Sequence, residues 1–197
     1  MIETKRLILR KPRLEDVDDF EPAYADPEVM RYLGDGSTGT REQIERGIGF
    51  WLERWEKNGI GLVSMESRET GRVVGRSGFL VWDSGSWETS SFAEAGERAE
   101  VELGWMVARE HWGHGYATEA ALVLRDWGIA ARGITRLISL IRPGNDRSVR
   151  VAEKIGETYE REVVLMGEPA LMYSLTSVGS TELVEERRRR HVRRRSG

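Results

Sequence analysis

The order of strand and helix patterns constrains the fold of this chain more than any other sequence feature. After Ile60, apolar and polar residues alternate in two runs, Gly61–Ser67 and Arg72–Trp82, which predicts an antiparallel hairpin. The second half predicts strands at Val101–Val107 and Thr135–Ile141, helices at Gly115–Ala131 and Ser148–Ile155, and a closing strand pair at Thr158–Leu165 and Ala170–Leu175. These two halves together predict a mixed α/β sheet with helices on its faces, rather than a doubly wound parallel sheet.

The N-terminal region adds further elements to this plan. Arg6–Arg10 has the pattern of a short strand, and Leu14–Phe20 has the acidic first turn of a helix. In Arg41–Asn58, apolar residues recur at helical spacing before Gly59, a residue typical of a helix C-terminus. Asp83–Arg98 is rich in Ser, Gly and Glu, and it is expected to be a long loop.

Length and charge indicate one globular domain, which we place at residues 1–178. Seven of the 30 Lys and Arg residues lie among the last eleven positions, so the rest of the chain carries a net charge of about −10. The segment 179–197 is therefore expected to be a basic, disordered tail, with nucleic-acid or ribosome contact as the alternative. No apolar run approaches the ~20 residues of a membrane helix, and a cytoplasmic protein without membrane contact is expected.

The chain has no cysteine and only three histidines, which argues against metal chemistry. Two of the histidines, His111 and His114, flank a glycine of the next motif, but two imidazoles do not make a metal site unaided. We therefore expect no bound metal.

A glycine-rich turn lies between the strand Val101–Val107 and the helix that follows it. Such a turn directs several unpaired backbone N–H groups to one point at the positive end of the helix dipole, and this arrangement binds diphosphate. A side chain at Gly113 or Gly115 would keep the phosphate away from the amides. The predicted phosphate-binding residues are Trp112, Gly113, His114, Gly115, Tyr116, Ala117 and Thr118. Glycines at this position also serve turn geometry alone, which is the alternative.

Four separated motifs give the chain a resemblance to the GNAT N-acetyltransferase superfamily. The turn is similar to its cofactor motif Q/R-x-x-G-x-G/A, except that Trp112 replaces Gln or Arg. That departure resembles the ribosomal-protein alanine N-acetyltransferase branch (RimJ/RimL-like), as do the other three motifs: Thr4–Arg10, Asp26–Tyr32, and the segment from Asn145 to Gly156. The resemblance implies a mostly antiparallel, V-splayed sheet of about seven strands with helices on both faces. It also implies acetyl-CoA as co-substrate, with its pantetheine arm near Trp105, Met106 and Val107.

Acetyl transfer to an amine requires a proton acceptor and a donor for the departing thiolate. Glu102 is our candidate base, with Glu100 on the same side of the strand; the alternative is an edge or surface carboxylate. Many members of the superfamily have a tyrosine acid where this chain has Ala152, so the resemblance makes Ser148 the candidate thiol donor. The alternative role of Ser148 is to cap the helix. Asn145 is expected to bind the cofactor arm, or only to form a turn.

The leading hypothesis is therefore an acetyl-CoA-dependent amine N-acetyltransferase, whose acceptor is a protein N-terminus or a small amine. A dinucleotide-binding oxidoreductase fits poorly, because Thr118 occupies the third small-residue position of that fingerprint. A non-catalytic acyl-CoA-binding or nucleic-acid-associated module is the remaining alternative. The sequence leaves open the acceptor and whether the protein forms a homodimer.

Overall fold

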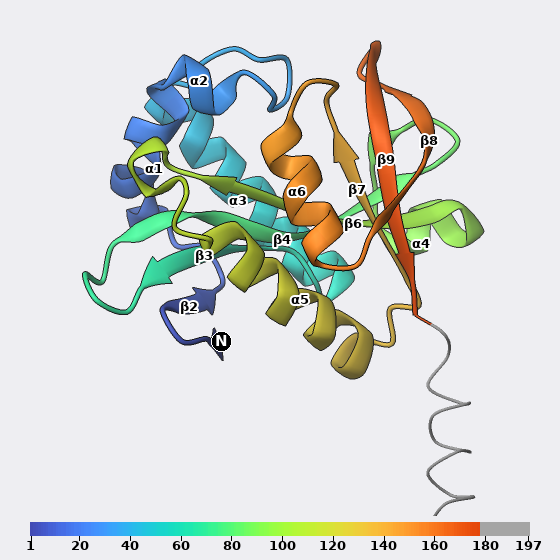
Figure 1. Ribbon diagram of the computed structural model, residues 1–197, viewed down its shortest axis with the longest axis horizontal. Helices are drawn as coiled ribbons and strands as arrows, with labels where there is room; N and C mark the ends of the chain where they lie inside the picture. The colour runs from blue at the N-terminus through green and yellow to red at the C-terminus, as the bar shows by residue number, and fades with distance from the viewer. Residues whose placement is uncertain (178–197) are drawn as a thin grey trace, which may run out of the picture.

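One continuous sheet organises the protein, and helices cover both of its faces (Figure 1). The computed structural model describes residues 1–177, so the predicted basic tail lies outside the described residues. The strands are β1 (Ile2–Glu3), β2 (Leu7–Arg10), β3 (Leu62–Ser67), β4 (Val73–Asp83), β5 (Glu88–Thr89), β6 (Ala99–Val107), β7 (Arg136–Ile141), β8 (Thr158–Leu165) and β9 (Glu168–Thr176). Their order in the sheet is β1-β2-β3-β4-β6-β7-β9-β8, and β5 pairs with β4.

All strand pairs are antiparallel except β6 with β7, which are parallel. This confirms the predicted mixed, mostly antiparallel sheet and excludes a doubly wound parallel sheet. The expectation of about seven strands agrees with the seven longer strands of the described residues. The two strands that were not predicted, β1 and β5, are each two residues long. The hairpin predicted from Gly61 to Trp82 is confirmed as the pair β3–β4.

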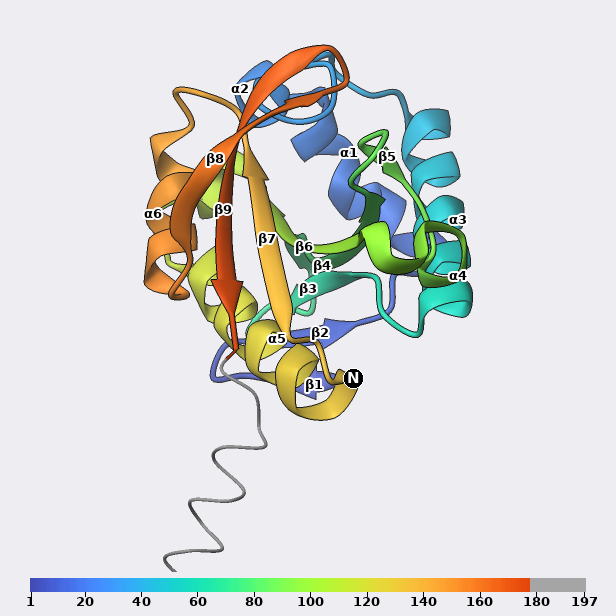
Figure 2. The ribbon, with the colours of Figure 1, turned by 90° about the vertical axis from the view of Figure 1, so that its right-hand side faces the viewer.

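The helices divide between the two faces of the sheet. They are η1 (Leu14–Asp16), α1 (Val17–Ala25), α2 (Pro27–Met30), α3 (Arg41–Asn58), α4 (Phe92–Ala95), η2 (Gly96–Arg98), η3 (Arg109–His111), α5 (Tyr116–Arg132) and α6 (Asp146–Lys154). Figure 2 shows α5 and α6 on one face, with α1 and α3 on the other. Within residues 1–177, no helix combines the length and apolar character that crossing a membrane requires.

Local sequence signals explain the bounds of α3, which match the prediction. Thr40 begins the helix because its hydroxyl accepts a hydrogen bond from the N–H of Gln43, while the Gln43 side chain accepts one from the N–H of Thr40. Gly59 ends it in the left-handed conformation, with φ of 67°. The face that carries Ile44, Ile48 and Trp51 is buried against the sheet and α1.

The prediction of a long loop at Asp83–Arg98 is wrong, because the segment contains regular secondary structure. Besides β5 and η2, this segment forms the one-turn helix α4, which begins after Ser91. The Ser91 hydroxyl accepts from the N–H of Glu94, and the Glu94 carboxylate accepts from the N–H of Ser91 at 3.0 Å. This reciprocal capping stabilises a helix too short to show apolar periodicity.

Strands β6 and β7 separate from each other soon after they meet. The parallel register joins Glu102 to Ile138, and Figure 2 shows the two strands running in different directions. On its other side, β6 stays paired with β4 through Val107. The β7-facing edge of β6 is therefore left without a strand partner toward its C-terminal end, and this opening positions the site described below.

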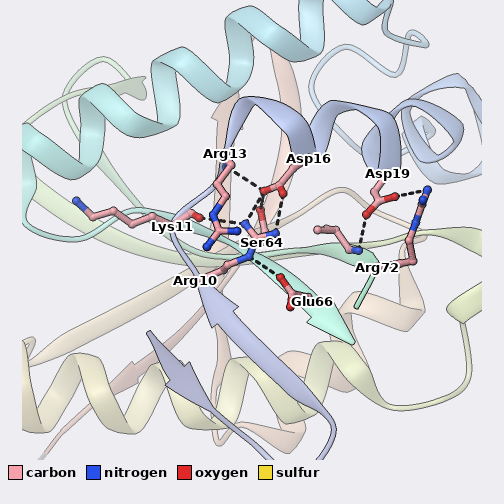
Figure 3. Close-up of polar contacts among 9 residues, drawn as sticks. Arg10, Lys11, Arg13, Asp16, Asp19, Ser64, Glu66 and Arg72 are labelled. Carbon is pink, nitrogen blue, oxygen red and sulfur yellow. Dashed lines mark hydrogen bonds and ion pairs between the residues drawn. The ribbon is translucent and has the colours of Figure 1, made fainter. Parts of the chain in front are cut away.

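A buried ionic network fixes η1 and α1 to the sheet (Figure 3). Arg10 on β2 donates to both oxygens of Asp16, at 2.9 and 2.7 Å, and to Glu66 on β3 at 2.6 Å. The Ser64 hydroxyl donates to Asp16 at 2.6 Å. Burial alone would raise the pKa of Asp16, but the hydrogen bonds from Arg10, Ser64 and the Arg13 N–H lower it overall. The carboxylate therefore stays ionised and paired in the folded protein.

Candidate active site

The turn between β6 and α5 has the backbone conformation that its glycines predict. Gly113 and Gly115 adopt φ of 81° and 80°, values that side-chain-bearing residues rarely tolerate. In the described part of the chain, a Cβ at Gly113 would meet nothing within 4 Å, and one at Gly115 would meet only the Arg6 guanidinium, 3.7 Å away. The glycines are therefore required for backbone conformation and an open approach, rather than for internal packing.

This turn leaves a row of backbone donors without partners. The six consecutive N–H groups from Gly113 to Thr118 donate to no backbone carbonyl within residues 1–177, whereas the next N–H, that of Glu119, donates to the carbonyl of Gly115. The first turn of α5 has the partial positive charge of a helix N-terminus. Free donors and positive potential at one place form a site suited to a phosphate group.

Trp112 holds the start of the turn against the end of β6. Its indole N–H donates to the carbonyl of Val107 at 2.8 Å, and the Arg147 guanidinium stacks over its ring at 4.0 Å. The tryptophan that departs from the superfamily motif thus links the end of β6, the turn and α6.

The turn opens into a cleft of ≈ 570 Å³ that is lined by the end of β6, the start of α5, α6 and the residues around α2. All the predicted cofactor-binding residues except His114 line this cleft: Trp105, Met106, Val107, Trp112, Gly113, Gly115, Tyr116, Ala117, Thr118 and Asn145. Ser148 also lines it, but Glu102 does not. His114 is absent from the lining; its ring stacks against Tyr116, with centroids 5.9 Å apart, and its carbonyl accepts from Arg6 at 2.8 Å.

The sequence interpretation missed the basic lining of the cleft. Arg147, Arg150 and Lys154 line it from α6, and Arg31 lines it from the segment after α2. The three α6 residues recur at spacings of three and four, the spacing of one helix face, and this signal was readable in the sequence. Tyr32 also borders the cleft and bridges it, because its hydroxyl donates to the carbonyl of Gly144 at 3.0 Å.

Asn145 caps α6, which corrects the alternative role given to Ser148. The helix begins at Asp146, two residues before the predicted start, and the side-chain oxygen of Asn145 accepts from the N–H of Ser148 at 3.3 Å. The Ser148 hydroxyl is therefore not the cap. Its oxygen instead accepts a hydrogen bond from the Trp105 indole at 3.2 Å, which leaves the hydroxyl proton available for another acceptor.

Glu102 lies in the middle of the sheet, so its interpretation as an edge or surface carboxylate is wrong. Its carboxylate accepts from the Trp82 indole at 2.7 Å. Burial raises the pKa of Glu102, although the Trp82 hydrogen bond partly offsets the effect. Glu100 differs, because it is paired with Arg136 at 3.0 Å. Among residues 1–177, no group of three or more His, Asp or Glu side chains is arranged to hold a metal.

Comparisons with known proteins agree with this geometry. A family model described as an acetyltransferase (GNAT) domain matches residues 6–158. YkkB of Bacillus subtilis (strain 168) is 32% identical over 181 residues, which cover 87% of this chain and 96% of YkkB.

Solved structures show the same architecture. An acetyltransferase from Agrobacterium tumefaciens str. C58 is 28% identical, with a TM-score of 0.71 over 89% of this chain and 94% of that one. RimL, a ribosomal L7/L12 alpha-N-protein acetyltransferase in complex with coenzyme A, shares the fold at 14% identity, with a TM-score of 0.70 over 88% of this chain and 96% of RimL. Since the family model spans most of its length, the chain belongs to the GNAT acetyltransferase family.

Proposed function

We propose that this chain is a cytoplasmic N-acetyltransferase that moves the acetyl group of acetyl-CoA onto a primary amine by direct attack in a ternary complex. The observation that carries this proposal is the row of six free N–H groups from Gly113 to Thr118 at the start of α5. Coenzyme A contains a diphosphate, which such a row of donors suits. RimL, whose structure contains coenzyme A, has the same fold.

The charge of the cleft supports the same ligand. Coenzyme A carries a third phosphate besides its diphosphate, and Arg147, Arg150 and Lys154 place three positive charges on the α6 side of the cleft. The Thr118 hydroxyl adds a neutral donor at the turn. Phosphate recognition here needs no metal, because main-chain and side-chain donors supply the positive potential.

The open edge of β6 is the proposed place for the pantetheine arm. Strand β6 pairs with β4 through Val107, whereas its pairing with β7 is limited to the region of Glu102. Apart from the Val107 carbonyl, which accepts from the Trp112 indole, the backbone groups near Trp105, Met106 and Val107 on the β7 side are therefore available to the amides of the arm, as in strand addition to a sheet edge. Asn145, which lines the cleft, keeps its side-chain N–H₂ free to donate to the arm.

Ser148 is the proposed donor to the departing thiolate. As the amine nitrogen bonds to the acetyl carbon, the carbon–sulfur bond breaks and the sulfur takes the electron pair. The Trp105 indole occupies a lone pair of the Ser148 oxygen, so the hydroxyl proton is free to point into the cleft. Ser148 is thus oriented as a donor rather than an acceptor.

Glu102 is the proposed acceptor of the proton that the amine loses, through water because Glu102 lies outside the cleft lining. Burial moves the pKa of Glu102 upward, toward neutral pH, and a general base is most effective when its pKa lies near the pH of the reaction.

The amine that receives the acetyl group is proposed to be a protein N-terminus or a small-molecule amine. A free α-amine, with a pKa near 8, is about a tenth neutral at pH 7, whereas deprotonating lysine costs about 3 kcal/mol more. An α-amine therefore demands less from Glu102.

The direct test is thiol release from acetyl-CoA in the presence of an amine panel. The panel contains peptides with a free N-terminus and blocked lysines, peptides with the reverse blocking, and small amines. Release above the no-amine blank, with mass-spectrometric detection of the acetylated product, is the expected result. Coenzyme A binding without turnover on any amine would instead favour a non-catalytic module.

Ser148→Ala and Glu102→Gln are expected to lower kcat while leaving coenzyme A binding within about twofold of wild type. The loss of general acid or base help predicts decreases of about 10-fold for Ser148→Ala and about 100-fold for Glu102→Gln. In wild type, activity should fall as pH drops through the raised pKa of Glu102, because only the carboxylate accepts the proton. Pre-steady-state rates measured at a series of pH values should show this decrease in the wild type and a smaller decrease in Glu102→Gln.

Ser90→Ala serves as the matched control, since Ser90 is a serine outside the cleft lining. It should retain the wild-type kcat. Unchanged kcat in Ser148→Ala, with the control also unchanged, would contradict the proposed role of the hydroxyl.

A further inference from the structure

The N-terminal segment Thr4–Leu7 contacts the start of α5 across more than a hundred residues of sequence. Arg6 donates from Nε to Glu119 at 2.7 Å and from Nη1 to the carbonyl of His114 at 2.8 Å. The Thr4 hydroxyl and the Arg6 backbone N–H also donate to Glu119, at 2.6 and 2.9 Å. One arginine thus connects the first α5 turn with the tip of the glycine turn.

The carbonyl that Arg6 binds is important for the free donors of the turn. In a regular helix, the N–H of Thr118 would donate to the carbonyl four residues earlier, that of His114. Here that carbonyl accepts from Arg6 instead, and Thr118 N–H donates to no backbone carbonyl among the residues described. The arginine therefore helps to keep α5 from extending into the turn and leaves this donor free.

Glu119 makes the same arginine electrostatically important. Its carboxylate lies in the first turn of α5, close to where a diphosphate would bind, and two anions there would repel each other. Burial alone would raise the pKa of Glu119, but hydrogen bonds from Thr4 and Arg6 lower it overall, so it stays ionised. The Arg6 guanidinium, 2.7 Å from it, compensates this charge.

The space around the two glycines of the turn is open, while Trp112 anchors the start of the turn and Arg6 holds the His114 carbonyl between the glycines. Among residues 1–177, a Cβ at Gly113 would have no neighbour within 4 Å, and the only neighbour of one at Gly115 is Arg6 itself. The guanidinium also lies over the ring of Tyr116, 4.6 Å from its centroid. Because two glycines in a loosely packed turn have high conformational freedom, a single anchoring side chain has a large effect on its order.

We propose that Arg6 is a positioning residue for the phosphate-binding turn: it fixes the His114 carbonyl and neutralises Glu119, so that the amides from Gly113 to Thr118 face the cofactor diphosphate. The inference rests on the proposed coenzyme A site. It assigns Arg6 an effect on phosphate recognition and none on the pantetheine arm or on the chemical step.

The test compares two ligands on Arg6→Ala. Coenzyme A affinity, measured by calorimetry, should fall about 10- to 100-fold, the effect of losing charge-assisted hydrogen bonds. S-acetylpantetheine lacks the diphosphate, so its KM and kcat as acetyl donor should stay within about twofold of wild type. A purely structural role would weaken both donors alike.

Two further variants separate geometry from charge. Arg6→Lys keeps the positive charge, but a single ammonium does not reproduce the fork that spans Glu119 and the His114 carbonyl, so its affinity should also fall. In the double variant Arg6→Ala/Glu119→Gln the repulsion is removed but the turn remains unanchored, and affinity should recover only in part. Arg68→Ala is the matched control: Arg68 donates to the Thr4 carbonyl at 2.9 Å, and its loss should leave coenzyme A affinity unchanged.

The outcomes are distinguishable. Wild-type coenzyme A affinity in Arg6→Lys would overturn the positioning role, as would equal losses for coenzyme A and S-acetylpantetheine in Arg6→Ala. If Arg6→Ala does not fold, the lysine variant decides alone. Failure of the wild-type protein to bind coenzyme A would contradict the proposed function itself, before any variant is compared.

Discussion

Replacing Gly115 with valine is expected to weaken coenzyme A binding by about 10²- to 10⁴-fold. Gly115 has φ of 80°, a conformation that strains a β-branched residue. Relief of this strain would turn the neighbouring amides away from the diphosphate, and each lost charge-assisted hydrogen bond costs about 1.5–3 kcal/mol. Gly113→Val, at φ of 81°, should behave alike. Calorimetric titration with coenzyme A measures the effect.

Gly167→Val separates backbone strain from loss of the phosphate site. Gly167 also has φ of 80° and open space around its Cβ position, but it lies between β8 and β9, outside the cleft lining. This control should lose a similar amount of thermal stability and keep its coenzyme A affinity. Retained binding in both Gly113→Val and Gly115→Val would remove the main support for the proposed cofactor site.

Local signals made much of the fold and the turn predictable. The bounds of α3 follow from Thr40, Gln43 and Gly59, which are neighbours of the residues they cap. The glycine turn could likewise be predicted, because the glycines that adopt positive φ values lie in the sequence directly before the helix that follows. The four-residue helix α4 had a local signal too, the Ser91 to Glu94 capping box, but it was too short for a periodicity argument.

Contacts between distant segments could not be predicted in the same way. Nothing near Arg6 in the sequence indicates that it binds Glu119 and the carbonyl of His114, because this pairing depends on the position of β2 beside α5. The position of Glu102 outside the cleft lining depends on where β6 and β7 separate, which is a property of the whole sheet. Sequence therefore predicted the backbone conformation of the glycine turn better than it predicted the surroundings of Glu102.

Glu157 is another residue whose environment could not be anticipated, and its side chain is only 2% exposed. Neither of its carboxyl oxygens has a hydrogen-bond partner within residues 1–177. Burial raises the pKa of Glu157 to about 8. The Ser139 hydroxyl, which donates to the Leu103 carbonyl, offsets part of this rise, and the nearby Glu102 adds to it. The carboxyl is therefore protonated in the folded protein at neutral pH and below.

Glu157→Gln is accordingly expected to stabilise the protein at alkaline pH. In the unfolded chain the carboxyl ionises near its ordinary pKa of 4.5, whereas in the folded protein it ionises only near 8. Stability is therefore fully present below pH 4.5 and is lost as pH rises through 8, with a total loss of up to roughly 5 kcal/mol. Glutamine has the same shape without the ionisation, so urea unfolding should show a gain of this order at pH 9.

The pH dependence of the difference separates this effect from ordinary repacking. At pH 4.5 the two proteins should differ by less than about 1 kcal/mol, because protonated glutamic acid and glutamine are both neutral and similar in size. Glu160→Gln is the matched control on β8: hydrogen bonds from Ser174 and Arg136 lower the pKa of Glu160, so its loss should destabilise the protein at pH 9. A stability difference between wild type and Glu157→Gln that is the same at pH 4.5 and pH 9 would show that the buried carboxyl does not titrate in this range, and that the folded chain holds Glu157 in a polar environment.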